Sequence, residues 1–120
     1  GQSSTPPVKV FVYTEREVPL LKLLMPPKDS PVLRSGICGQ KMYGTQVHMH
    51  RFLLAAKHVR TLNPAEADFF YVPAWPKCML DAPPNGAGVS VEELSARYVR
   101  VIAALPHFHR NGNGRDHIFL

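Results

Sequence analysis

RTLNPAEADFFYVPAW, residues 60–75, decides the fold class of this chain. Asn63 is a favourable helix N-cap, the proline after it suits the first helical position, and Glu66 is placed to reach back to the cap, so we expect a short helical turn there. The FFYV run that follows, residues 69–72, has no polar alternation and ends at a proline, which is typical of a strand covered on both faces. Such a strand needs helices on each side, so the stretch indicates an α/β layered fold.

Length and composition allow one small domain or a part of a larger one, because the chain has 120 residues of which 45% are hydrophobic. The start, residues 1–7, resembles the end of a linker, and the last residues resemble an unfinished strand. We therefore expect a fragment whose domain occupies residues 8–120. No apolar run is long enough to cross a bilayer and no signal peptide is visible, so any membrane anchor is expected upstream of Gly1.

The chain is basic, with a net charge of +5 and an isoelectric point near 9.5. The lysines and arginines are spread along the chain without a cluster longer than a pair, which is typical of a solvated surface. Nucleic acid is therefore not an expected partner.

Apolar spacing and breakers predict the other elements in the order strand, helix, strand, helix, strand, which is typical of a Rossmann-like parallel sheet with flanking helices. Ser90 with Glu93 three residues later forms a capping box for the second helix. The expected elements are a strand at 8–13, an irregular connection at 14–39 with a short turn at 20–24, a helix at 43–57, the strand at 69–72, a loop at 77–88, a helix from 90 to 105, a turn at 107–115 and a strand opening at 118–120.

The histidines do not predict a metal site. His48 and His50 point to opposite sides of the first helix, so we expect His48 in water and His50 in the core with its ring nitrogens hydrogen-bonded. His107 and His109 share a loop in which no Cys, Asp or Glu completes a zinc-like set.

Other catalytic motifs are also missing from the sequence. There is no Asp-x-Asp pair for a cation on a nucleotide diphosphate, no P-loop and no nucleophile elbow. The Gly-Asn-Gly sequence at 112–114 comes before a strand instead of after one, so it is interpreted as a turn. The catalytic residues are left unassigned.

Position in the fold suggests where a ligand would bind, because ligands of open parallel sheets lie outside the carboxyl ends of the strands. Thr14 and Glu15 follow the first strand, Trp75 follows the second, and Gln46 lies at the amino end of the first helix. Trp75 could stack on a sugar ring or pack its loop onto the domain. Glu15 could accept a proton or hydroxyl hydrogen bonds, or be an inert surface acid.

Asp116 and His117 lie at the opposite end of the sheet from this cleft. We expect them to fix the turn before the last strand through hydrogen bonds from their side chains to the backbone.

The two cysteines, Cys38 and Cys78, have neither zinc nor redox spacing. They could form a disulfide or be two buried thiols, and only an oxidising compartment would sustain the bridge.

Four stretches together closely resemble the exostosin-like glycosyltransferases of family 47: YGTQVHMHRFLL at 43–54, RTLNPAEADFFYVP at 60–73, PNG at 84–86 and PHFHRNGNGRDH at 106–117. The resemblance covers residues 8–120, and the second and fourth stretches in combination are specific. It is nearest to the plant-type branch that includes xylan xylosyltransferases and xyloglucan galactosyltransferases.

The resemblance implies a Golgi type II membrane protein whose lumenal region is an inverting GT-B glycosyltransferase that uses a UDP-sugar and needs no metal at an Asp-x-Asp site. Residues 8–120 would be part of the amino-terminal Rossmann-like domain, which faces a glycan or polysaccharide acceptor. The donor would bind the carboxyl-terminal domain, so this part alone would hold no cofactor and be inactive. Complexes with other glycosyltransferases are an expected form of partnership.

The lumenal location that the resemblance implies also predicts a Cys38–Cys78 disulfide, since members of this branch often carry cysteines at both positions. Two features depart from the family pattern: Gln46 stands where members often have Glu, and residues 86–90 differ from the usual loop. The alternative function is a carbohydrate-binding or structural α/β module without catalysis.

Overall fold

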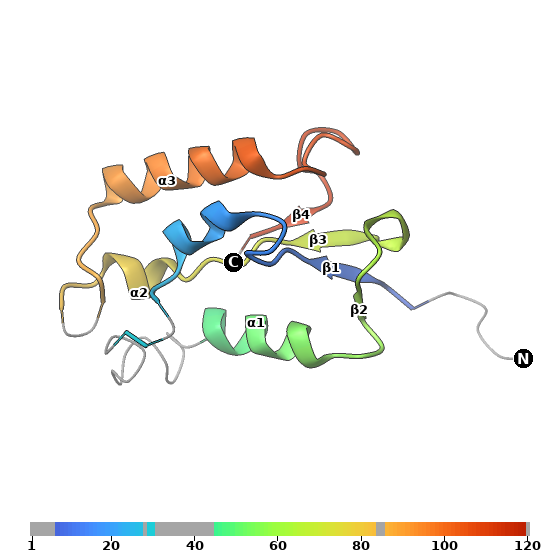
Figure 1. Cartoon of the computed structure of the whole chain (residues 1–120), viewed down its shortest axis with the longest axis horizontal. Coiled ribbons are helices and arrows are strands. Elements are labelled where there is room, and N and C mark those ends of the chain that lie inside the picture. Colours follow the sequence, from blue (N-terminus) through green and yellow to red (C-terminus); the bar gives the residue numbers. More distant parts are fainter. Residues whose placement is uncertain (1–6, 28, 31–44, 84–85, 120) are drawn as a thin grey trace, which may run out of the picture.

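The computed structural model of the chain describes residues 7–27, 29–30, 45–83 and 86–119, with only the backbone for Thr45 and Gln46. Its centre is a parallel sheet in the order β2-β1-β3-β4 (Figure 1). The strands are β1 Val10–Val12, β2 Arg60–Thr61, β3 Phe69–Tyr71 and β4 His117–Ile118. The predicted α/β fold with a Rossmann-like parallel sheet is confirmed.

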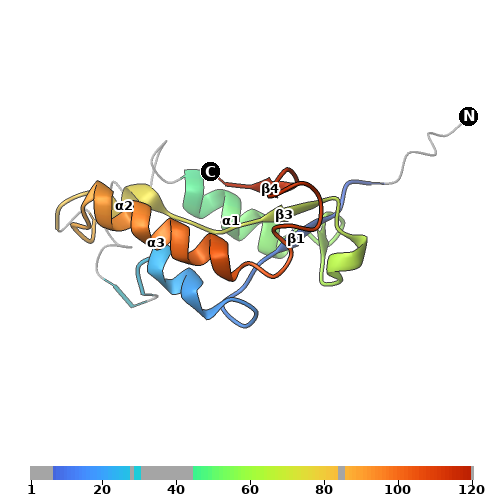
Figure 2. The ribbon, with the colours of Figure 1, turned by 90° about the horizontal axis from the view of Figure 1, so that it is seen from above.

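Helices cover both faces of this sheet (Figures 1 and 2). The helix α1 (Thr45–Ala55) lies on one face. The 3-10 helix η1 (Pro19–Leu24) and the helix α3 (Val91–Ala104) lie side by side on the other. Two short elements complete the described chain, the 3-10 turn η4 (Pro64–Glu66) and the helix α2 (Pro76–Leu80).

Neighbouring residues of the central strands enter different cores. Phe11 and Phe70 belong to the cluster under α3 and η1, together with Leu94. Val12 and Tyr71 belong to the cluster under α1. Side chains alternate across a strand, so an uninterrupted apolar run is stable only where both faces are covered, as the sequence predicted.

Two elements were not predicted. The strand β2 is only two residues long and polar, so it lacks the apolar signal of a strand, yet it pairs with Val10 and Phe11 of β1. The helix α2 occupies the start of the loop expected at 77–88. Its proline at the first helical position and the burial of Cys78 and Met79 stabilise a turn of helix that the surrounding prolines and glycines concealed.

The predicted caps form, but with fewer side-chain contacts than expected. Asn63 Oδ1 accepts a hydrogen bond from the Ala65 amide at 3.0 Å, whereas the amide of Asn63 donates to Thr61 Oγ1 and not to Glu66. Ser90 Oγ accepts from the Glu93 amide at 3.1 Å. The carboxylate of Glu93 accepts from Arg97 instead of reaching back to the cap.

The helix α1 exposes two of its large apolar side chains, Met49 and Phe52. Within the described ranges no helix is both long and apolar enough to cross a membrane.

Replacing Ser90 with alanine tests the cap of α3. The Glu93 amide would lose its acceptor, so we expect the free energy of unfolding to fall by about 1 kcal/mol. Urea unfolding measures the change, and Ser95→Ala is the matched control because Ser95 is exposed inside the same helix. Equal losses in the two variants would contradict the capping role.

Candidate functional site

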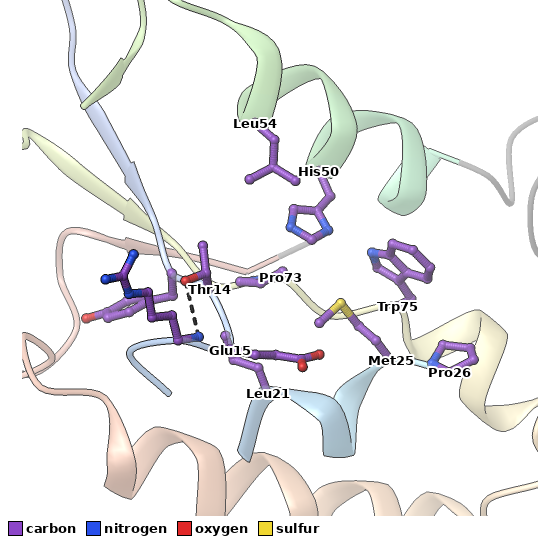
Figure 3. Close-up of a pocket in the computed structure, with 11 residues that line it drawn as sticks. Thr14, Glu15, Leu21, Met25, Pro26, His50, Leu54, Pro73 and Trp75 are labelled. Atoms are coloured by element: carbon purple, nitrogen blue, oxygen red, sulfur yellow. Dashed lines mark hydrogen bonds between the residues drawn. The ribbon is translucent and has the colours of Figure 1, made fainter. Parts of the chain in front are cut away.

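A pocket of about 390 Å³ opens beyond the carboxyl ends of β1 and β3 (Figure 3). It lies between the α1 layer and the η1 layer, at the edge of the sheet where the sequence placed a cleft. Three chain regions distant in the sequence supply its walls. The residues are Tyr13, Thr14, Glu15, Arg16, Leu21, Met25, Pro26, His50, Leu54, Pro73 and Trp75.

The structure brings three of the four predicted cleft residues to this pocket: Thr14, Glu15 and Trp75. The fourth, Gln46, is in the first turn of α1, but its side chain is outside the described part of the structure. The functional roles assigned to these four residues stay predictions.

Thr14 is held by its own turn. Its amide donates to Glu17 Oε2 at 2.8 Å, and its hydroxyl donates to the same oxygen. Partial burial raises the pKa of Glu17, but these hydrogen bonds outweigh it and leave the pKa below the usual value. Glu17 accepts the hydroxyl proton of Thr14, and the Arg16 amide donates to the same hydroxyl oxygen at 3.3 Å, so Thr14 can offer a ligand only its remaining oxygen lone pair.

Glu15 is exposed, and its carboxylate points into the pocket on the side of Leu21 and Met25 (Figure 3). His50 reaches in from α1 on the opposite side. Among the described residues, the carboxylate of Glu15 and the imidazole of His50 thus lie on opposite sides of a mainly apolar space, and Arg16 also lines it.

Trp75 packs the loop after β3 onto the domain, which is the second of the two interpretations left open by the sequence. The residue is only 8% exposed and lies in a cluster with Val47 and Cys78. The indole Nε1 is buried and has no hydrogen-bond partner in the described structure.

His50 differs from its prediction as a core histidine with satisfied ring nitrogens. It is partly exposed and lines the pocket, and its buried Nδ1 has no partner among the described residues. Burial lowers its pKa to about 4, and the charges of Arg51 and Arg60 add to this effect. The imidazole is therefore neutral at pH 7. Its place on the apolar face of α1 was readable from the sequence, but its lack of a partner was not.

A chain of side-chain hydrogen bonds connects the loop before β4 to the end of β1. Arg110 Nε donates to Asp116 Oδ2 at 3.2 Å, and Asp116 Oδ1 lies 2.9 Å from His117 Nδ1. His117 Nε2 lies 2.7 Å from the hydroxyl of Tyr13, which borders the pocket. The predicted contacts of Asp116 and His117 with the backbone are corrected: these side chains bond to other side chains, across 104 residues in the case of Tyr13.

The protonation states along this chain follow from its geometry. Burial raises the pKa of Asp116, but hydrogen bonds from His117 and Arg110 outweigh it and hold the pKa below its usual value, so the carboxylate only accepts. Burial lowers the pKa of His117 and raises that of Tyr13 to about 12. A neutral His117 thus donates from Nδ1 to Asp116 and accepts at Nε2 from the Tyr13 hydroxyl.

The other two loop histidines do not converge. His107 stacks on Phe70 with ring centroids 5.2 Å apart, and His109 Nδ1 pairs with Asn113 Oδ1 at 2.6 Å. Among the described residues no cluster of three His, Cys, Asp or Glu side chains could hold a metal ion.

Comparison with known proteins supports the resemblance directly, since the exostosin GT47 domain family matches residues 4–120. This chain belongs to the exostosin GT47 family. Similar curated proteins include a probable glucuronosyltransferase of Oryza sativa subsp. japonica, Os01g0926400, which is 38% identical over 115 residues. Two probable beta-1,4-xylosyltransferases of Arabidopsis thaliana, IRX10L and IRX10, are 38% identical over 116 residues and 39% identical over 118.

Each of these alignments covers 94% of this chain but only 25% of the relative, so the chain spans about a quarter of the length of the curated proteins it matches. No solved structure gives a significant match.

Two of the stretches that carried the family resemblance meet in space through Arg110. Its guanidinium donates to the carbonyl oxygens of Pro64 at 2.7 Å and Ala67 at 2.5 Å, and it lies 4.5 Å from the centre of the Phe70 ring. The GRDH loop and the NPAEADFF turn of this GT47 chain are thus parts of one structural unit.

Cys78 is completely buried and is not a free thiol. Cys38 lies outside the described residues, so the Cys38–Cys78 pairing stays a prediction.

Removing the charge of Arg110 tests the structural unit that Arg110 forms between the loop before β4 and the turn before β3. Arg110→Gln leaves the buried Asp116 without its cation, so we expect the free energy of unfolding to fall by about 2–3 kcal/mol, less than for a fully buried pair because Arg110 is partly exposed. Arg115→Gln, in the same loop but exposed, should change it by no more than about 0.5 kcal/mol. Thermal or urea unfolding that ranks the two variants equally would contradict the network.

The imidazole of His50 should make the free energy of unfolding depend on pH. Its folded pKa of about 4 lies below the ordinary 6.5, so the folded state binds fewer protons than the unfolded state between these values, and stability falls as the pH drops through that window. The urea midpoint of His50→Leu should therefore fall less between pH 7 and 4.5 than that of the unsubstituted protein.

His107, His117 and Asp116 also have lowered pKa values, so the pH dependence should be reduced in this variant and not abolished. His48→Leu is the control, because His48 is exposed on the same helix and its variant should keep the full dependence. Identical pH profiles for the His50 variant and the unsubstituted protein would refute the assignment.

Proposed function

We propose that this chain is the acceptor-facing part of a glycosyltransferase that moves a sugar from a UDP-sugar to a glycan or polysaccharide. Membership of the GT47 family and the names of its relatives as probable glucuronosyltransferases and xylosyltransferases support transfer of a sugar. The observation that carries the acceptor role is the pocket at the carboxyl ends of β1 and β3. Ligands bind at this edge in open parallel sheets.

The reaction we propose is inverting and does not depend on a metal held by an Asp-x-Asp pair. An acceptor hydroxyl attacks the anomeric carbon of the donor sugar, the bond from that carbon to the UDP oxygen breaks, and an enzyme base takes the hydroxyl proton. The UDP group is bound by a carboxyl-terminal domain of the full-length protein. The chain itself then needs no cofactor and is inactive alone.

Glu15 is our candidate for the group that binds the acceptor hydroxyl. It is the only carboxylate among the described residues that line the pocket, and it points inward (Figure 3). A carboxylate only accepts hydrogen bonds at neutral pH, and a hydroxyl that donates to it is oriented and made more nucleophilic.

The cellular setting we propose is the lumenal side of the Golgi membrane, with an anchor upstream of Gly1. An oxidising lumen would sustain a Cys38–Cys78 bridge. Association with other glycosyltransferases of the same polysaccharide pathway is the partnership that such a membrane enzyme would have.

Assays of the full-length gene product with common UDP-sugars and oligosaccharide acceptors test this function. We expect transfer from at least one donor, and a protein that neither hydrolyses nor transfers from any of them would refute the enzymatic role. Sugar binding without transfer would instead favour the alternative of a carbohydrate-binding module.

Within that assay, Glu15→Ala should lower kcat/KM for the acceptor by roughly 10-fold to 100-fold, because a hydrogen bond to a charged group contributes about 1.5–3 kcal/mol. Glu92→Ala serves as the control, since Glu92 is an exposed carboxylate on α3 and does not line the pocket. An unchanged kcat/KM in the Glu15 variant would exclude its role in acceptor binding.

A further inference from the structure

The side chain of His117 joins two strands of the sheet that are not neighbours. In the strand order β2-β1-β3-β4, β3 separates β4 from β1. His117 belongs to β4, yet its Nε2 lies 2.7 Å from the hydroxyl of Tyr13, which directly follows β1. On the way the imidazole stacks on Phe70 of β3, with the ring centroids 4.8 Å apart and the ring planes 15° from parallel. One side chain therefore ties β4 to the end of β1 across the strand between them.

His117 does not act on a ligand of the pocket directly. Its side chain is completely buried and is not part of the pocket wall. Both ring nitrogens are already engaged, Nε2 by Tyr13 and Nδ1 by Asp116 at 2.9 Å. The edge of the Phe108 ring also packs against the imidazole, with the centroids 5.2 Å apart. Any effect of His117 on the pocket must therefore pass through the residues that it holds.

Tyr13 is the partner of His117 that reaches the pocket. It lines the pocket itself and comes immediately before Thr14 and Glu15. Tyr13 is completely buried, its ring contacts neighbouring aromatic rings, and its amide donates to the Tyr71 carbonyl at 3.1 Å. The amide bond fixes the backbone of Tyr13, and the bond to His117 fixes the far end of its side chain.

The strand β4 also holds the other strand end at the pocket. The Val72 amide donates to the Ile118 carbonyl at 3.0 Å, and the next residue, Pro73, lines the pocket. β4 is therefore bonded to the ends of both strands that lead into the pocket, to β3 through the backbone and to β1 through His117. The place of Glu15 relative to Pro73 depends on both of these connections.

The bond between Tyr13 and His117 has no substitute in the buried interior. A buried donor or acceptor that loses its partner is costly, because no water replaces it. Without this bond the Tyr13 ring is held only by aromatic contacts, which are less directional than a hydrogen bond. The chain that leaves β1 toward Glu15 then has more freedom to shift.

We propose that His117 is a positioning residue of the acceptor site, which acts through Tyr13 to place Thr14 and Glu15 at the pocket. The inference rests on the proposed function for the role of the pocket in acceptor binding. Asp116 orients His117 in turn: its carboxylate accepts from Nδ1, which leaves Nε2 as the acceptor for the Tyr13 hydroxyl.

Tyr13→Phe in the full-length gene product breaks this bond and keeps the ring. We expect kcat/KM for an oligosaccharide acceptor to fall by roughly 10-fold, because even a small misplacement of a substrate-orienting group is costly. KM for the UDP-sugar should not change, since the donor is proposed to bind another domain. Ser90→Ala is the control, because it weakens a helix cap outside the network and should leave both constants unchanged. Equal acceptor constants in the two variants would overturn the proposal.

His117→Asn breaks the same bond from the other side. The asparagine amide stands near the place of Nδ1, so it still donates to Asp116, but its side chain is too short to reach Tyr13. We expect the same selective loss for the acceptor, with an unchanged KM for the UDP-sugar. If only one of the two variants folds, that variant decides alone, and an unchanged acceptor kcat/KM in it overturns the positioning role.

Coupling to Glu15 distinguishes positioning from a general loss of stability. If Tyr13 acts by placing Glu15, its hydroxyl matters little once Glu15→Ala has removed the carboxylate. The double variant Tyr13→Phe with Glu15→Ala should therefore lose clearly less acceptor kcat/KM than the product of the two single losses. Losses that simply multiply would show that Tyr13 does not act through Glu15 and would overturn the proposal.

The transfer assay and acceptor binding together separate this proposal from the function on which it rests. Transfer whose acceptor kcat/KM ignores Tyr13 would remove the positioning role and keep the enzyme. An oligosaccharide whose Kd rises in Tyr13→Phe, without transfer from any UDP-sugar, would support positioning and remove the proposed transfer. A protein that neither transfers sugar nor binds the oligosaccharide would overturn both.

Discussion

The fold depends on one buried charge, the carboxylate of Asp116. A carboxylate that is 4% exposed is stable only if cations or hydrogen-bond donors surround it, and Arg110 and His117 supply both. Arg110 and Asp116 both belong to the loop before β4, so their ion pair closes this loop. The remaining N–H groups of Arg110 bind two carbonyl oxygens at the turn before β3, and its guanidinium covers Phe70.

This constraint extends to the pocket through Tyr13. The hydroxyl of Tyr13 is paired with His117, and the amide of Tyr13 is paired with the carbonyl of Tyr71, so the end of β1 is fixed on two sides. Thr14 and Glu15 follow immediately, and their own turn is held by Glu17. The pocket therefore lies beside a strand end that hydrogen bonds hold in place, although Thr14 and Glu15 themselves belong to a loop.

Local chemistry explains what the sequence could predict. The caps at Asn63 and Ser90, the buried strand at Phe70 and the apolar face of α3 each depend on residues within a few positions of one another, and all of them appear in the structure. The pairing of β2 with β1 has no such local signal, and neither has a side-chain bond between residues 13 and 117. That is why β2 and the role of His117 were missed.

The site was predictable in position but not in detail. The general rule for parallel sheets located the pocket, and Thr14, Glu15 and Trp75 were named from it. His50 lies on the apolar face of α1, so the sequence predicted a core histidine. Its ring nitrogens were expected to be hydrogen-bonded because buried polar groups normally are. Its unpaired nitrogen depends on the distance between α1 and the segment after β3, which only the three-dimensional packing determines.

Because α1, the η1 region and the strand ends each contribute to the pocket walls, a molecule bound there would touch both layers of the sheet at once. It would act as a non-covalent cross-link between elements of the two helical layers. By mass action, occupancy would raise the apparent melting temperature in proportion to the logarithm of ligand concentration above Kd. The resistance of this domain to heat would then report how much of its ligand is present.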